Sequence, residues 1–131
     1  MKILTRSIRI VPVLLLMGTI FFLSHQSGIK LQLLYIFGLD KLAHGVMYAA
    51  LAATLLYAVP RKVQLLRPWR TGALIVFFCL LYGMTDEYHQ SFIPGRVPSF
   101  GDIIADVVGA SLLVYLWLRY HSSRLAPVPS S

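Results

Sequence analysis

The chain has 131 residues, of which 57 % are hydrophobic and 13 % are charged. A soluble domain carries about a quarter charged residues, so this composition indicates one domain whose solvent is lipid. The net charge is +7 at pH 7, but the basic residues lie in short clusters between apolar runs, which argues against nucleic-acid binding. Cys79 is the only cysteine, so a disulfide framework and a cysteine-based metal site are excluded, and we expect a packed core thiol.

The first apolar run lies between Arg9 and Lys30, where 20 residues include no Lys, Arg, Asp or Glu. Crossing the hydrocarbon core of a bilayer takes about 20 helical residues. A signal peptide is the alternative, but the segment Ser24–Gly28 is a poor small-residue cleavage site. We therefore expect an uncleaved helix over residues 8–27.

Three further spanning helices are expected over residues 40–59, 71–90 and 99–118. The apolar runs inside the last two are short, with 15 residues at 71–85 and 16 at 103–118, so these helices must carry polar residues into or beside the membrane. The candidates for that polar layer are Asp40, His44, Asp86, Glu87, His89, Asp102 and Asp106. Residues 1–120 are then a single transmembrane domain. The polar, proline-bearing residues 121–131 are expected to form a flexible cytoplasmic tail.

The distribution of Lys and Arg predicts the orientation of these helices. The amino-terminal segment, the loop at 60–70 and the tail hold nine of them, and the other two loops hold three. The positive-inside rule then places both termini and the middle loop in the cytoplasm. All five acidic residues fall on the extracytoplasmic side, while Trp69 and Trp117 lie near the cytoplasmic interface as anchors.

Small residues at a spacing of four predict where the helices touch. Gly45, Ala49 and Ala53 share one face of the second helix, and Ala105 and Gly109 share one face of the fourth. Such faces let helix backbones approach closely in lipid. The predicted fold class is therefore an all-α, integral membrane four-helix bundle with both termini cytoplasmic.

The second helix opens with a polar face. Asp40 follows Phe37–Leu39 at an N-cap position, which is sufficient to explain it. His44 lies one turn later on the same face, with Tyr48 a further turn on. His44 either donates a structural hydrogen bond to a neighbouring helix or takes part in a site, whereas Lys41 needs only to reach the interface.

The start of the fourth helix contains a predicted capping box, with Ser99 as N-cap and Asp102 three positions on. Asp106 has no such explanation. It lies about one turn further in, on the face of Asp102, where an unpaired carboxylate is costly in lipid.

The segment 86–90 places Asp86 and Glu87 near the carboxyl end of the third helix, where the helix dipole disfavours anions. Gln90 shares a face with Asp86, and His89 lies beside it. The two carboxylates need a partner, which can be Arg96, Lys41, a shared proton or a metal. Arg96 follows a Pro-Gly turn and either neutralises a carboxylate or grips an anionic headgroup.

These motifs together resemble the VanZ-like family, named for a teicoplanin (glycopeptide) resistance protein. The matching segments are Asp40–His44 with Tyr48, Asp86–Arg96, and Ser99–Asp102 continuing through Asp106 and Gly109. The chain departs from the pattern at Asp106, where many relatives have asparagine. The resemblance implies a multi-pass bacterial membrane protein that lowers susceptibility to a lipoglycopeptide. It supplies no agreed reaction.

The sequence therefore predicts a non-enzymatic protein of the bacterial inner membrane, with no cofactor and no metal. It would bind an amphiphile at the outer leaflet, either a lipid-linked cell-wall precursor or an acylated antibiotic, through His44, Asp86, Glu87, Gln90, Arg96 and Asp106. The alternative is an intramembrane hydrolase or transferase in which the histidines and carboxylates hold a metal or transfer protons. Against it, the chain has no His-Glu-x-x-His or Gly-x-Ser-x-Gly motif.

Overall fold

The computed structural model describes residues 2–27 and 39–125, and the side chains of residues 8–27 and 39–120. Lys30, which the charge count used, and the last six residues of the predicted tail lie outside the described residues. The described chain contains helices and no strands, so the prediction of an all-helical protein is confirmed for that part. The helices are α1 (Lys2–Ser24), α3 (Leu39–Ala58), α4 (Arg61–Leu66), α5 (Pro68–Gln90) and α6 (Phe100–Leu125).

Several helices begin or end at other residues than predicted, and a local hydrogen bond or a proline marks two of these ends. α1 ends at Ser24, where the amide of Gln26 bonds to the carbonyl of Leu23, three residues back, and so leaves the helical spacing of four. α5 begins with Pro68, which suits the first turn because its missing N–H needs no partner there. The short α4 was not predicted.

α6 extends beyond the predicted helix over residues 99–118, and the flexibility of the segment after residue 120 stays a prediction. α6 continues through residues 121–125 and ends at Leu125. No proline occurs in the chain between Pro98 and Pro127, so nothing in this stretch removes a backbone N–H and interrupts the helix.

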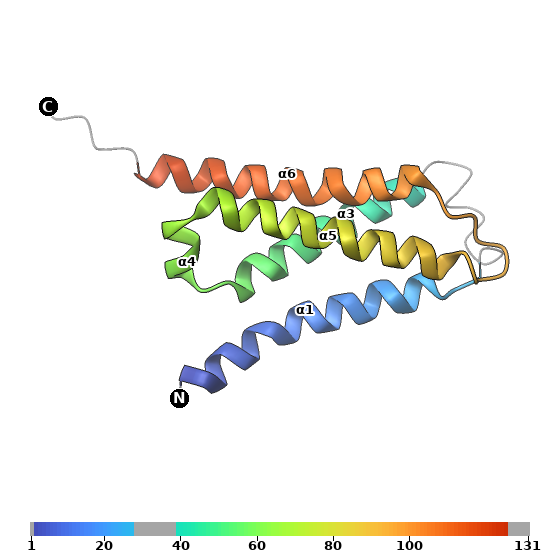
Figure 1. Cartoon of the computed structure of the whole chain (residues 1–131), viewed down its shortest axis with the longest axis horizontal. Coiled ribbons are helices and arrows are strands. Elements are labelled where there is room, and N and C mark those ends of the chain that lie inside the picture. The colour runs from blue at the N-terminus through green and yellow to red at the C-terminus, as the bar shows by residue number, and fades with distance from the viewer. Residues whose placement is uncertain (1, 28–38, 126–131) are drawn as a thin grey trace, which may run out of the picture.

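The four long helices run lengthwise beside one another, and α1 diverges from the others toward its amino-terminal end (Figure 1). α3 packs most extensively against α6, as the small-residue faces predict. A Cβ atom on Gly109 would overlap the carbonyl oxygen of Gly45, and one on Gly45 would lie 3.5 Å from the carbonyl oxygen of Ala105. Glycine at position 109 therefore allows the backbones of α3 and α6 to touch, whereas a Cβ at position 45 would make only an ordinary contact.

The described residues have an apolar surface over an interior that includes polar groups. The buried apolar core contains Val13, Ile20, Tyr48, Leu51, Ala52, Leu56, Ile75, Cys79, Ala110 and Val114, so the predicted burial of Cys79 is confirmed. Many large apolar side chains are exposed along the helices, whereas five Asp, Glu and Gln side chains are at most 4 % exposed. A surface of this kind suits a lipid environment.

α6 contains a stretch, Phe100–Tyr120, that is long and apolar enough to cross a membrane. Within the described residues it is the one stretch that meets this test, and Ile8–Ser24 is a shorter apolar helix. The helices whose apolar runs are shortened by polar residues do not meet it. Crossing by all four long helices and the direction of crossing stay predictions.

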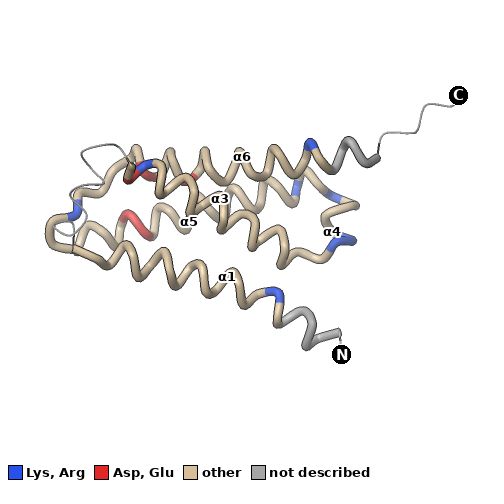
Figure 2. The backbone as a smooth tube through the Cα atoms, turned by 180° about the vertical axis from the view of Figure 1, so that it is seen from behind, with Lys and Arg blue, Asp and Glu red and all other residues tan. Residues whose placement is uncertain are grey.

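Charges of opposite sign separate along the bundle (Figure 2). The acidic residues gather where α3 and α6 begin and where α5 ends, and most of the Lys and Arg lie around α4, the start of α1 and the far part of α6. At the basic end the Arg9 guanidinium lies over the ring of Tyr57, 5.5 Å from its centroid. The acidic end is called the carboxylate end below.

Candidate functional site

A partly buried polar contact at the carboxylate end joins α3 to α6. His44 Nδ1 lies 2.9 Å from Asp106 Oδ1, and the Asp106 side chain is fully buried. Its other oxygen, Oδ2, faces α5, since a Cβ atom on Gly83 would lie 2.6 Å from it. α3, α5 and α6 therefore meet at Asp106. The sequence requires a partner for this carboxylate inside the predicted span, and His44 is that partner.

Asp86, on α5, is held by neutral donors. The Ser24 hydroxyl of α1 donates to Asp86 Oδ2 at 2.7 Å, and Gln90 Nε2 donates to the same oxygen at 3.0 Å. The predicted pairing of Asp86 with Gln90 on one helix face is thus observed, whereas Ser24 was not predicted.

Glu87 is 4 % exposed, and its carboxylate reaches the loop before α6. Its Oε2 accepts a hydrogen bond from the backbone N–H of Ser99 at 2.7 Å. Its Oε1 is buried and has no hydrogen-bond partner among the described residues, and the same is true of Asp106 Oδ2 and the Tyr48 hydroxyl. Buried polar atoms are almost always hydrogen-bonded, so three such atoms in one end of the bundle require an explanation.

The structure contains the Ser99 cap of the predicted capping box but not its second hydrogen bond, from the Ser99 N–H to Asp102. Ser99 does cap α6, because its Oγ accepts from the backbone N–H of Gly101 at 3.1 Å. Asp102 does not complete the box, because the Ser99 N–H bonds to Glu87. The Asp102 carboxylate instead lies 3.1 Å from Lys41 Nζ.

Lys41 also lies 3.1 Å from Asp40 Oδ2, so one exposed ammonium bridges two carboxylates at the rim. The N-cap role predicted for Asp40 is wrong, because α3 already includes Leu39 and Asp40 lies within its first turn. The Asp40 carboxylate accepts a hydrogen bond from Lys41 and forms an ion pair with it, so Asp40 belongs to the rim and not to the buried group.

Arg96 has contacts that residue types alone did not predict. Its Nε donates to the Gln26 carbonyl at 3.1 Å and its Nη2 to the Leu23 carbonyl at 2.9 Å. These carbonyls lie at the carboxyl end of α1, where backbone acceptors lack partners within the helix. The tight turn at Gly95, with φ of 77°, precedes Arg96 and requires a residue that tolerates a left-handed conformation.

His89 lies apart from the buried carboxylates. It stacks with His25, directly after α1, with His89 Nε2 3.3 Å from His25 Nδ1 and the ring centroids 5.5 Å apart, and Phe21 of α1 packs against the His89 ring. The structure therefore assigns His89 to the α1–α5 contact.

The predicted residues thus divide into separate groups. The inner cluster, as it is called from here on, contains His44, Asp86, Glu87 and Asp106. The ligand atoms of His44, Asp86 and Glu87 all lie within 4.8 Å of one another, close enough that these three side chains could hold a metal ion. The predicted residues outside the inner cluster are Asp40, His89, Gln90, Arg96 and Asp102.

Sequence reasoning missed two residues that shape the inner cluster. Ser24 is the polar residue that ends a long apolar run, and a hydroxyl there was a signal for a partner on another helix. Gly83 interrupts the apolar run of α5, and its missing side chain makes the space for Asp106.

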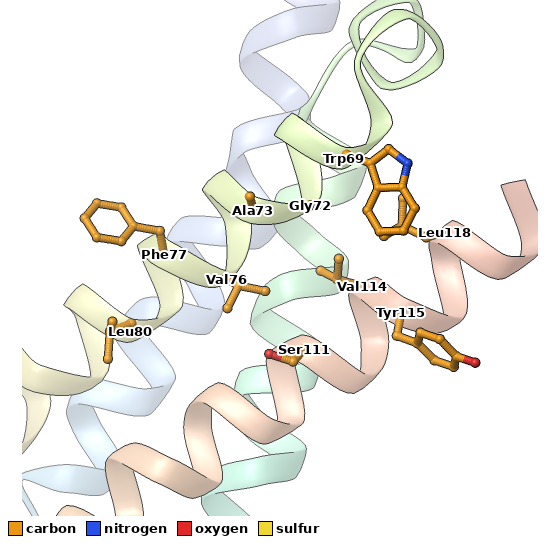
Figure 3. Close-up of a pocket in the computed structure, with 10 residues that line it drawn as sticks. All are labelled: Trp69, Gly72, Ala73, Val76, Phe77, Leu80, Ser111, Val114, Tyr115 and Leu118. Atoms are coloured by element: carbon orange, nitrogen blue, oxygen red, sulfur yellow. The ribbon is translucent and has the colours of Figure 1, made fainter. Parts of the chain in front are cut away.

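A hollow lies between α5 and α6, away from the inner cluster (Figure 3). It has a volume of about 500 Å³ and is lined by apolar side chains together with Ser111, among them Trp69, Phe77 and Leu118. It contains no carboxylate, histidine or cysteine, so it offers surface for hydrocarbon and no groups for acid–base or metal chemistry.

The fold and the inner cluster define a helical protein with an apolar exterior and buried polar groups at one end. The model of the VanZ/LLP1 family matches residues 6–121, and the chain belongs to this family. The family and the span in α6 together identify a membrane-associated protein. No curated protein and no solved structure matches the chain.

Proposed function

We propose that the protein spans the membrane with its four long helices and binds the polar headgroup of an amphiphile at its carboxylate end. The orientation follows the positive-inside rule, so this end faces the outer leaflet. The ligand class is a lipid-linked cell-wall precursor, whose sugar hydroxyls and amides supply hydrogen-bond donors. The unpartnered buried Oε1 of Glu87 carries the proposal, because it is an acceptor for such donors.

Access and surroundings also support headgroup binding. His44 is the most exposed member of the inner cluster, with 15 % of its side chain accessible, so it marks where a ligand would approach. Large apolar side chains near the same end are well exposed, including Tyr88, Phe92 and Phe100. They would contact the hydrocarbon part of an amphiphile while its headgroup bonds to the cluster.

The binding test uses the purified protein in detergent and a polyprenyl-linked cell-wall precursor, with retained precursor counted by native mass spectrometry. Glu87→Gln is expected to weaken binding at least about tenfold, because a hydrogen bond to a charged group contributes about 1.5–3 kcal/mol. The matched control is Asp40→Asn, a carboxylate-to-amide change at the same end outside the inner cluster, which should bind normally. Equal retention by wild type and Glu87→Gln, or equal retention of a polyprenol that lacks the headgroup, would contradict the proposal.

Binding of this kind would lower susceptibility to teicoplanin by competing for, or shielding, the precursor. Cells that express the wild-type protein are expected to need a higher inhibitory concentration than cells that express Glu87→Gln at equal abundance. No difference between the two would remove the resistance role and leave precursor binding to be judged by the mass-spectrometric test.

The second candidate function is a hydrolase or transferase that acts on the same class of lipid. The His44–Asp106 pair favours it, because a carboxylate that orients an imidazole is a common arrangement in acid–base catalysis. Incubation of the precursor with wild-type protein, followed by mass analysis of the lipid, distinguishes the two. Cleavage that wild type performs and His44→Gln does not would establish the enzyme, and an unchanged lipid supports binding alone.

A further inference from the structure

The inner cluster brings two adjacent carboxylates of α5 and one imidazole of α3 around a common point. Asp86 and Glu87 are each 4 % exposed, and their ligand atoms and that of His44 lie within 4.8 Å of one another. Two carboxylates so close together in a poorly solvated interior repel each other and lose hydration. Lys41, the nearest rim ammonium in sequence to His44, is held by Asp40 and Asp102.

Each of the three side chains is held by a hydrogen bond through one of its polar atoms, so its second polar atom is the candidate metal ligand. His44 is held through Nδ1 by Asp106, which leaves Nε2. Both donors to Asp86 bind Oδ2, which leaves Oδ1. Glu87 is held through Oε2 by the Ser99 amide, and its buried Oε1 has no hydrogen-bond partner within the described chain.

Side chains held through one polar atom in this way are typical of metal ligands. A metal-binding histidine donates its other ring N–H to a carboxylate, and ligating carboxylates are themselves hydrogen-bonded, so that the ligands are held in position. Asp106, Ser24, Gln90 and the Ser99 amide would be such outer partners. They come from α1, α5, α6 and the loop before α6, so several parts of the fold hold these three side chains in position.

We propose that His44, Asp86 and Glu87 bind one divalent cation, such as Mn²⁺ or Zn²⁺, and that its open coordination positions bind an anionic oxygen of the amphiphile headgroup. Imidazole and carboxylate together suit these ions, and the two carboxylates balance the charge of the cation. Ligand atoms about 2.1 Å from a tetrahedral ion lie about 3.4 Å apart, so binding requires the three side chains to close by about 1 Å.

The cation would contact the anionic oxygens of the headgroup. This part of the inference rests on the binding function proposed above. Carboxylate oxygens can accept from the hydroxyls and amides of the headgroup but repel its anionic oxygens, whereas a bound cation attracts these and offers a direct bond to a phosphate oxygen. The sequence predicted no metal, because its residues match no metal-ligand motif. The three ligands come from two helices, and the spacing between those helices along the chain carries no signal.

The test uses full-length protein in detergent, stripped of metal with EDTA and titrated with Mn²⁺ while electron paramagnetic resonance follows the free ion. Wild type and Asp40→Asn are expected to bind stoichiometric Mn²⁺, with Zn²⁺ displacing it. Glu87→Gln and Asp86→Asn should each weaken binding at least about tenfold, since loss of an outer partner alone costs 10–100-fold. Circular dichroism and size-exclusion chromatography identify variants that remain folded.

Two outcomes overturn the cation site. One is no Mn²⁺ binding by the folded wild-type protein, and the other is equal binding by wild type and both folded ligand variants. Precursor binding with and without EDTA separates this proposal from the proposed function. Equal precursor binding in both conditions rejects the cation as the headgroup contact and leaves the binding function intact. Stoichiometric Mn²⁺ binding without precursor binding supports the site and rejects the function.

Discussion

Gly83→Ala tests whether α5 and α6 approach as closely as the buried Asp106 requires. The new Cβ would lie 2.6 Å from Asp106 Oδ2, about 0.8 Å closer than the 3.4 Å at which ordinary contact begins. The carboxylate must then shift, and its other oxygen holds His44 at 2.9 Å. A displacement of this size weakens that hydrogen bond or separates the helices.

The expected energy follows from two opposing effects. Overpacking of a well-packed interior costs about 1–3 kcal/mol, and alanine favours a helix over glycine by about 1 kcal/mol. Gly18→Ala, in α1, supplies the control, because no heavy atom lies within 4 Å of a Cβ built there. That variant should show the helix effect alone, so the two alanine variants should differ in unfolding free energy by about 1–3 kcal/mol.

The assay is reversible unfolding in mixed detergent micelles, followed by far-ultraviolet circular dichroism, with wild type and both variants measured under the same conditions. Gly83→Ala should be the less stable of the two alanine variants. If the two variants have the same unfolding free energy, α5 does not approach Asp106 as described, and the geometry of the inner cluster is wrong.

Three further predictions follow from the same contacts. A cysteine at Ser91 should react with an impermeant thiol reagent from outside the cell and one at Ser123 should not, and the reverse pattern would reject the orientation. Asp106→Asn should fold and still bind the precursor, because its amide oxygen still accepts from His44. Asp106→Leu should lose precursor binding and about 1–3 kcal/mol of unfolding free energy. Arg96→Lys should destabilise the protein by about 1.5–3 kcal/mol, since an ammonium does not reproduce the two-pronged contact with the carbonyls of α1, and an unchanged stability would contradict that contact.

The all-helical architecture could be predicted because the sequence carries strong local signals for it. Apolar runs of helical length marked where the helices lie, and the small residues Gly45 and Gly109 predicted the α3–α6 contact that the structure contains. The carboxyl end of α6 lies beyond the predicted residue 118, because the prediction ended the helix with its apolar run. A polar segment without proline can continue a helix outside the apolar run.

The pairing of polar groups was harder to predict. Sequence reasoning required a partner for Asp86 and Glu87 and considered Arg96, Lys41, a shared proton or a metal. The observed partners are a hydroxyl, an amide side chain and a backbone N–H. Backbone groups carry no residue-type signal. Contacts between α1 and α5, such as Ser24 with Asp86, depend on a helix register that only tertiary packing sets.

The central claim, that an amphiphile headgroup binds at the carboxylate end, is tested most directly by photocrosslinking in membranes. A polyprenyl-linked cell-wall precursor with a diazirine on its headgroup is irradiated with the full-length protein, and crosslinked peptides are mapped by mass spectrometry. The account predicts crosslinks within residues 83–106 and the first turns of α3, and it predicts that unlabelled precursor removes them. Crosslinks confined to α4 and the basic end, or crosslinks that excess unlabelled precursor leaves unchanged, would contradict it.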